Sequence, residues 1–168
     1  TTKNIITFQV PEGGNFDIEP YKDFYITTIT DNISSSILYK NNEKIYETDS
    51  VINYTLVAKD QLHIFANNMI YNLNIETGEV ISSAPTPFNT SDINKHKISY
   101  DPELTDINKF ITVNDTIYEV DVTTNTFNPV DLPSSDFAPQ YDYILNLDEN
   151  HVIAYFYDKL PSILEKGT

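Results

Sequence analysis

The sequence of 168 residues contains no cysteine, no arginine and no tryptophan, and it has only four glycines. Without cysteine the chain has no disulfide framework, no thiolate metal site and no cysteine nucleophile. All ten basic residues are lysines, so no guanidinium is present to bind phosphates or carboxylates in a bidentate way. Neither a phosphate-binding loop nor a Gly-x-Ser-x-Gly motif occurs. These absences weigh against nucleotide chemistry and against nucleophilic catalysis.

Positive charge is scarce relative to negative charge, because 25 acidic residues against ten lysines give a net charge of −15. Such a chain is poorly suited to nucleic acid or to an anionic membrane. No apolar run approaches the roughly 20 residues of a membrane-spanning helix, so we expect a soluble chain with no membrane span. The acidic residues are spread along the whole sequence, as on the solvated faces of strands and turns.

The composition is that of a folded protein, with 40% hydrophobic and 12% aromatic residues, among them 12 Tyr and 9 Phe. The first residue is Thr1 rather than Met, which leads us to expect a processed or excised chain. Residues 1–168 are therefore expected to form one all-β domain, or a fragment of a longer polypeptide.

Short β-rich runs separated by Asn, Asp and Gly dominate the sequence, and their short connections favour antiparallel hairpins. We expect strands near 4–9, 24–30, 35–40, 44–48, 52–57, 61–66, 69–75, 79–83, 97–100, 109–113, 116–122, 126–130, 142–147 and 151–157. Three proline-containing stretches, at 11–23, 84–96 and 131–140, are predicted to be irregular. Only 102–108 and 161–166, each following a proline, are expected to form a helical turn.

An internal repeat is the clearest signal in the chain. Ile64–Val80 aligns with Ile111–Phe127 at an offset of 47 residues, with five of 17 positions identical. Asn67-Asn68 corresponds to Asn114-Asp115, both suited to two-residue turns that need positive φ. Gly78 corresponds to Asn125, and both tolerate the left-handed conformation that closes a hairpin loop. A fainter copy at 39–46 leaves open whether strand 52–57 belongs to the first or the second unit.

The segment Asn68–Val80 resembles the repeat core of quinoprotein-like and kelch-like β-propellers, in which an apolar-Tyr strand leads into a Thr-Gly turn. The resemblance covers 62–83 and 109–130 well and 24–57 poorly. It implies antiparallel four-stranded blades, at about 24–57, 52–83 and 97–130, with a partial blade at 141–157. No kelch-type Gly-Gly pair, Trp-Asp dipeptide or docking tryptophan is present, and no residue matches a quinone or calcium ligand motif, so no cofactor is expected.

Fourteen strands at four per blade give too few blades for a closed propeller, which has about four to eight blades. Open sheet edges are also aggregation hazards. We therefore expect either a partial β-propeller that the rest of the same polypeptide completes, or one that other copies complete. An irregular β-sandwich is the alternative fold.

No catalytic, cofactor-binding or metal site stands out in the sequence. His63, His96 and His151 lack metal-ligand spacing, and the clusters 92–94, 106–108 and 148–150 lack the pattern of a calcium loop. The four Asn-x-Ser/Thr sequons, at Asn32, Asn53, Asn89 and Asn114, are about as many as chance gives. Tyr141, Tyr143, Tyr155 and Tyr157 are spaced by two residues, as in a sheet core or a sugar-binding surface, and we favour the core.

These features favour a non-enzymatic propeller-type scaffold within a larger protein assembly, such as a virion tail or a bacterial surface complex. The expected partners are other protein subunits or the remainder of the polypeptide, with an extracellular, cell-surface or virion location preferred. A carbohydrate-binding surface module is the first alternative and a glycoside hydrolase the second. At Gly78 we expect Gly78→Val to destabilise the chain, Gly78→Asn to be milder, and Asn125→Gly to be tolerated.

Overall fold

The computed structural model describes residues 7–20, 24–31, 35–58, 61–94, 108–114, 116–130, 143–146, 150–156 and 159–165. Its strands are β1 (Asn15–Pro20), β2 (Tyr25–Thr30), β3 (Ser36–Lys40), β4 (Glu43–Thr48), β5 (Ile52–Ala58), β6 (Gln61–Ala66), β7 (Met69–Asn74), β8 (Val80–Pro85), β9 (Asn108–Val113), β10 (Thr116–Asp121), β11 (Thr126–Val130), β12 (Tyr143–Asn146), β13 (His151–Phe156) and β14 (Lys159–Glu165). The short 3-10 helix η1 (Thr90–Asp92) follows β8. None of the described residues belongs to a helix that is long and apolar enough to cross a membrane.

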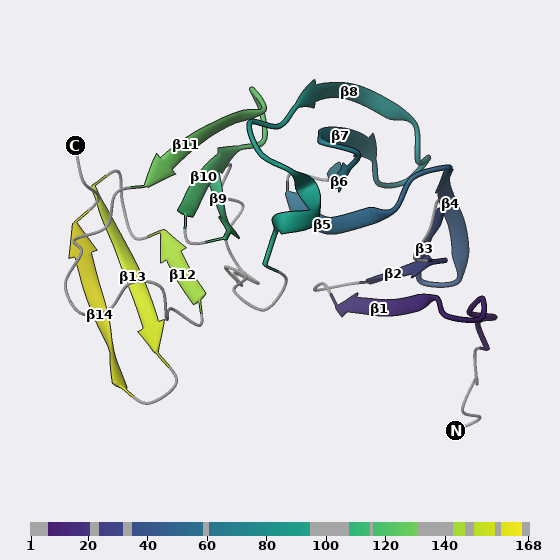
Figure 1. The fold of residues 1–168 in the computed structure, drawn as a ribbon, viewed down its shortest axis with the longest axis horizontal. Helices are drawn as coiled ribbons and strands as arrows, with labels where there is room; N and C mark the ends of the chain where they lie inside the picture. The colour runs from purple at the N-terminus through teal and green to yellow at the C-terminus, as the bar shows by residue number, and fades with distance from the viewer. Residues whose placement is uncertain are drawn as a thin grey trace.

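The strands form four antiparallel sheets in chain order. The first sheet is β1-β2-β3-β4 and the second is β5-β6-β7-β8, while β9 to β11 and β12 to β14 form three-stranded sheets. The sheets follow one another along an arc that leaves β1 to β4 at one end and β12 to β14 at the other (Figure 1). The prediction of an all-β fold built from antiparallel four-stranded sheets is confirmed.

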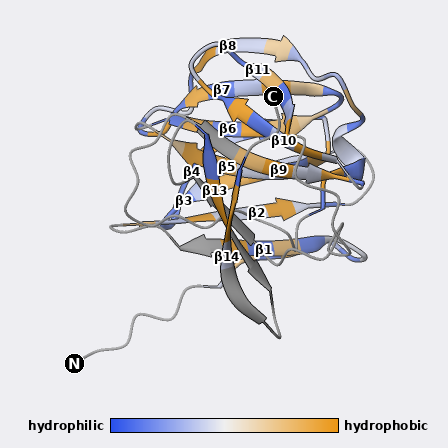
Figure 2. Cartoon of the chain, turned by 90° about the vertical axis from the view of Figure 1, so that its left-hand side faces the viewer, coloured by the Kyte–Doolittle hydropathy of each residue, from blue (hydrophilic) through white to orange (hydrophobic). Residues whose placement is uncertain are grey.

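Each sheet packs its apolar face against the next sheet. Side chains of the first and second sheets, among them Ile26, Leu38 and Ile64, form one buried cluster. Tyr54 and Phe65 of the second sheet pack with residues of the third in another. A smaller cluster joins the third sheet to the fourth. Hydrophobic residues accordingly lie along the strands (Figure 2), and burial of these side chains is the main force holding the sheets face to face.

Successive side chains of β6 point to opposite faces of the second sheet, so this strand contributes to the contacts with both neighbouring sheets. Leu62, Ile64 and Ala66 face the first sheet, whereas Phe65 faces the third. The ring of Phe65 lies 5.8 Å from that of Tyr54 and 6.3 Å from that of Phe127, between centroids. Because both faces of β6 are buried, its sequence from Leu62 to Ala66 is an apolar run with one polar residue, His63.

The turns confirm the 47-residue repeat. The offset carries β6, β7 and β8 onto β9, β10 and β11. Asn67 and Asn114 have φ of 51° and 52°, and Gly78 and Asn125 have φ of 71° and 56°. Both loops before the last strand are also closed in the same way. Asn74 Oδ1 accepts hydrogen bonds from the amides of Glu76 and Thr77, as Asp121 Oδ1 does from those of Thr123 and Thr124.

An isolated bridge adds a further backbone contact to β9 of the third sheet. Ile93 forms an antiparallel bridge with Val113, and the Asn94 amide donates to the Thr112 carbonyl at 2.8 Å. Ile52 pairs with Ala66 in the equivalent place of the second sheet. Val113 lies 47 residues after Ala66, so the Ile93–Val113 bridge corresponds in place to the Ile52–Ala66 pair. The expected strand 97–100 and helical turn 102–108 lie outside the described residues, apart from Asn108, which begins β9.

Several expected elements differ from the structure. Residues 15–20, expected to be irregular, form β1, and 161–166, expected to be a helical turn, lies largely within β14. The stretch 84–96 contains the end of β8 and η1. Residues 7–10 are not in a strand, while the rest of the expected strand 4–9 is outside the described residues, as is 131–140.

The open question of strand 52–57 is settled, because β5 pairs with β6 and not with β4. The first sheet consequently spans 15–48 rather than 24–57. The faint copy at 39–46 is not equivalent to the repeat. Its Asn41-Asn42 turn joins the third and fourth strands of a sheet, whereas Asn67-Asn68 joins the second and third. A two-residue turn with positive φ closes any tight hairpin, so it does not mark a position within a sheet.

Candidate interaction surface

The histidines form no metal site in the described part of the chain, where no group of three or more His, Cys, Asp or Glu residues is placed to hold a metal ion. His63 is buried at the junction of the second and third sheets, and His151 lies at the start of β13. His96 lies outside the described residues, as do most of the acidic clusters 106–108 and 148–150. Of the cluster 92–94, Asp92 belongs to η1 and Ile93 pairs with Val113.

His63 belongs to a polar network between the second and third sheets. Its Nδ1 lies 2.7 Å from Asn72 Oδ1, and Asn72 Nδ2 donates to Ser82 Oγ and to Asn125 Oδ1, both at 2.9 Å. If Asn72 Oδ1 is the acceptor, Nδ1 carries the proton, and Nε2 has no partner among the described residues. Burial lowers the pKa of His63, against an opposing contribution from its contact with Asn72. His63 thus contacts Asn72, and Asn72 in turn links the second sheet to Asn125 of the third.

The sequons and the four tyrosines lie only partly within the described residues. Asn53 Oδ1 accepts a hydrogen bond from Thr90 Oγ1 at 2.7 Å, whereas Asn89 and Asn114 are exposed. Asn32 lies outside the described residues. Tyr143 is paired with Tyr155 in the β12–β13 register. Tyr141 and Tyr157 lie outside the described residues, so whether these residues form a core or a sugar-binding surface stays a prediction.

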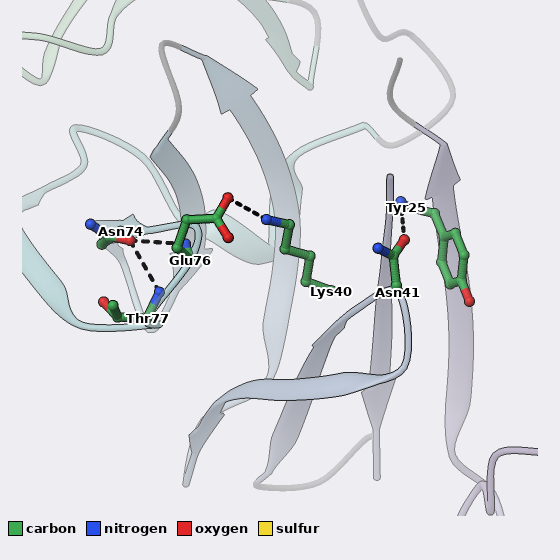
Figure 3. Close-up of polar contacts among 6 residues, drawn as sticks. All are labelled: Tyr25, Lys40, Asn41, Asn74, Glu76 and Thr77. Atoms are coloured by element: carbon green, nitrogen blue, oxygen red, sulfur yellow. Dashed lines mark hydrogen bonds and ion pairs between the residues drawn. The ribbon is translucent and has the colours of Figure 1, made fainter. Parts of the chain in front are cut away.

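Polar contacts reinforce the junction of the first and second sheets (Figure 3). Lys40 at the end of β3 forms an ion pair with Glu76, which lies in the loop between β7 and β8. The same ammonium is 5.2 Å from the centre of the Phe24 ring, within cation–π range. Asn41, next along the chain, accepts from the Tyr25 amide through Oδ1 at 3.2 Å and continues the pairing of β2 with β3. These contacts hold the loop of one sheet against its neighbour.

Gly78 brings that loop still closer to the first sheet. A Cβ atom at Gly78 would lie 1.6 Å from the Ile45 carbonyl oxygen, so only glycine fits here. At the equivalent loop of the third sheet, Asn125 instead reaches the second sheet through its side chain and accepts from Asn72. The expectation that Gly78→Asn is mild is therefore wrong in its reasoning, because the two loops share a backbone conformation but not a neighbour.

The first sheet presents an apolar face that no other sheet covers. Register pairs Phe16 with Ile29 and Ile18 with Thr27, which places these residues opposite the face that carries Ile26. On this face Phe16 is 44% exposed and Ile18 is 46% exposed, whereas Ile29 is only 4% exposed. Ile37 and Tyr39 continue the same face on β3. We call the set Phe16, Ile18, Ile29, Ile37 and Tyr39 the first end face.

The segment 7–10 lies over part of the first end face. The Phe8 ring is 5.9 Å from that of Phe16 and 5.2 Å from that of Tyr39, between centroids. Val10 in the same segment is 42% exposed. At the edge of the face, Lys44 Nζ and Glu47 Oε2 form an exposed ion pair at 2.7 Å. An apolar centre with a charged edge is the usual layout of a protein–protein interface.

In the fourth sheet, two described apolar side chains lie on the face turned away from the third sheet. Val152 is fully buried with Phe110 of the third sheet, and Leu164 packs against the same cluster. Ile153 is paired with Ile163, and by alternation both lie on the opposite side of the sheet. Ile163 is 64% exposed. We call Ile153 and Ile163 the second end face.

No protein-family model matches the chain, and no curated protein is similar to it in sequence. Solved structures are similar in fold. The Pan2 WD40 domain of Neurospora crassa matches with a TM-score of 0.55 and 12% identity, over 94% of this chain and 48% of that domain. The WD40 β-propeller domain of Doa1 matches with a TM-score of 0.50 and 14% identity, over 87% and 48%.

The chain has the fold of a partial β-propeller. A third solved structure, BBS1N in complex with ARL6DN, matches with a TM-score of 0.50 and 10% identity, over 90% of this chain and 50% of that one. The chain thus spans about half the length of the propellers that it matches. At these identities the likeness concerns the fold alone.

The end faces were missed in the sequence because their strands were read as irregular or helical. Phe16-Asp17-Ile18-Glu19 alternates between apolar and acidic residues with a period of two, which is the pattern of a half-exposed strand. The prolines at 11 and 20 obscured it. The second end face needed the pairing of β13 with β14, which the sequence reading did not include.

Proposed function

We propose that the chain is a non-enzymatic β-propeller-type scaffold that binds other proteins through its end faces within a larger assembly. The observation that carries this proposal is the pair of exposed apolar faces at the two ends of an unclosed arc of sheets. Among the described residues, three buried apolar clusters fill the spaces between neighbouring sheets. Uncovered faces of this kind mark interaction sites in soluble proteins.

We also propose the class of partner, the type of blade and the biological setting. The partner is protein, supplied by other subunits or by further sheets of the same polypeptide, and BBS1N shows a protein complex for one structurally similar chain. Of the blade types, we favour the quinoprotein-like or kelch-like pattern that the repeat at 62–83 resembles. A virion tail or a bacterial surface complex is the proposed setting, because repetitive β-structures serve there as rigid parts.

Cross-linking of the protein in its source, followed by mass spectrometry, tests the proposal. Lys44 stands at the edge of the first end face with its side chain 54% exposed, and Lys40, 18% exposed in the first junction, serves as the internal control. We expect cross-links from Lys44 to another polypeptide or to residues outside 1–168, and none from Lys40. Cross-links from Lys44 that all lie within a single copy of residues 1–168 would contradict the proposal. A glycan array and chromogenic glycosides test the two alternative functions in parallel.

A further inference from the structure

The three contacts between successive sheets are built in the same way. Each of the two end faces resembles one side of such a contact, without a sheet packed against it. A junction is the packed contact between two successive sheets. We call the face of a sheet that is turned toward the next sheet in the chain its leading face, and the opposite face its trailing face. At each junction the leading face of one sheet packs against the trailing face of the next. The first end face is the trailing face of the first sheet, and the second end face is the leading face of the fourth. The two end faces of this chain are therefore the two sides of one further junction of the same kind.

Exposed apolar residues concentrate at these ends. The described residues include six large hydrophobic side chains that are exposed: Val10, Phe16, Ile18, Val80, Ile81 and Ile163. Phe16 and Ile18 belong to the first end face, with Val10 beside them, and Ile163 belongs to the second. The other two lie on β8, an edge strand of the second sheet. The apolar surface thus lies largely where a further sheet would continue the ring.

We infer that a second copy of this chain covers both end faces in a head-to-tail dimer. The first end face of each copy packs on the second end face of the other, which gives two equal junctions and a closed ring. Length supports this occupant, because one copy spans 48% of the Pan2 and Doa1 propeller domains and two copies supply about one complete domain. The inference rests on the proposed function, in which the end faces bind protein.

Net charge gives the dimer a distinguishing property. Each copy carries −15, so the approach of two copies is opposed by like charge, while the end faces themselves are apolar. Salt screens repulsion beyond about 10 Å at 0.1 M. The dimer should therefore become tighter as salt rises, whereas a contact made by ion pairs would weaken.

Sedimentation of the full chain over a range of concentrations, at 50 and 500 mM salt, tests the inference. We expect a species of twice the 19.2 kDa chain mass that is favoured by salt. Ile18→Lys and Ile163→Lys each place a charge in both junctions and should weaken the dimer by about tenfold or more. Ile81→Lys is the matched control, because Ile81 is 53% exposed but outside both faces. Circular dichroism checks folding, with Ile18→Thr as a milder replacement.

Mixing the two end-face variants separates this dimer from other arrangements. In a head-to-tail pair of Ile18→Lys with Ile163→Lys, one junction carries both lysines and the other is unaltered. The mixture should therefore associate more strongly than either variant alone. If two copies met through the first end face only, Ile163→Lys would have no effect and mixing would not restore association.

A single 19.2 kDa species at every concentration and salt level would overturn the inference. So would an equal effect of Ile81→Lys and Ile18→Lys. If the chain is monomeric but cross-links from Lys44 reach a different polypeptide, the second-copy inference fails and the proposed function stands. If the chain is monomeric and those cross-links are absent, both fail.

Discussion

At Gly78 and Asn125 the backbone conformation could be predicted from the sequence, but the neighbouring residues could not. Their shared need for positive φ followed from residue type and spacing, and both have it, at 71° and 56°. Their different neighbours did not follow, because Gly78 meets the Ile45 backbone across a junction whereas Asn125 meets a side chain. Local conformation is encoded locally, but a tight approach between sheets depends on how the whole chain is arranged.

Gly78→Ala should destabilise the chain more than Gly13→Ala. Both glycines have positive φ, at 71° and 75°, but a Cβ at Gly13 would meet nothing within 4 Å. Gly13→Ala therefore isolates the cost of the left-handed backbone, about 1–2 kcal/mol. At Gly78 the displaced Ile45 carbonyl should add about 1–3 kcal/mol. Urea midpoints of the two variants measure the difference, and equal losses would show that the loop does not press on β4.

Asn125→Gly should cost about 0.5–1.5 kcal/mol rather than being neutral. Glycine keeps the positive φ but removes the acceptor of the Asn72 Nδ2 hydrogen bond at 2.9 Å. Asn72→Ala serves as the partner in a double-mutant cycle by chemical denaturation. The two losses should be less than additive. Strict additivity would mean that the bond contributes nothing to the junction.

Stability should fall as the pH is lowered through the titration of His63. Its side chain is fully buried, and burial lowers its pKa from the usual 6.5. Below pH 6.5 the unfolded chain therefore binds a proton that the folded chain does not, so the contribution is complete above that pH and is lost toward the lower folded pKa. Urea midpoints between pH 5.5 and 7.5 should rise with pH. The slope should diminish in His63→Gln, and an unchanged slope would exclude His63 as its source.

At the scale of elements, the sequence predicted β2 to β13 and missed β1 and β14, which fall in proline-containing stretches expected to be irregular or helical. The turns at Asn67-Asn68 and at Gly78 defined β6 and β7 because hairpin chemistry is local. Proline was overweighted as a strand breaker. Pro20, Pro85, Pro129 and Pro161 all lie in β1, β8, β11 and β14, which are edge strands of their sheets. An edge strand tolerates a missing amide where that position faces away from its neighbour, and only the assembled sheet shows which strands are edges.

Thr90→Val should destabilise the second sheet by about 1–3 kcal/mol. The hydroxyl of Thr90 in η1 donates to Asn53 Oδ1 and accepts from the Asn68 amide at 3.2 Å, so it ties β5 to the β6–β7 turn. Valine keeps the shape but leaves both partners unsatisfied. Ser91→Ala, at an exposed position in the same helix, is the control and should be nearly neutral. Hydrogen exchange should show faster opening of β5 in the valine variant alone.

At the scale of the molecule, the blade count was accessible from the sequence and the interaction surface was not. Counting strands showed that the chain is too short to close a ring of blades. The end faces became visible only when register showed that Phe16 and Ile18 on one sheet, and Ile163 on another, are turned away from their neighbours. A face is uncovered because of where its sheet stands in the arc, and no local pattern encodes that position.

Thiol labelling of introduced cysteines tests most directly whether the end faces are open in one chain and covered in an assembly. The sequence has no cysteine, so Ile18→Cys, Ile163→Cys and the β8 control Ile81→Cys each carry a single reactive group. At high dilution all three should be labelled rapidly. In the assembled protein, Ile18→Cys and Ile163→Cys should be protected together while Ile81→Cys keeps its rate. Protection of Ile18→Cys at high dilution, or equal labelling of all three in the assembly, would contradict the account.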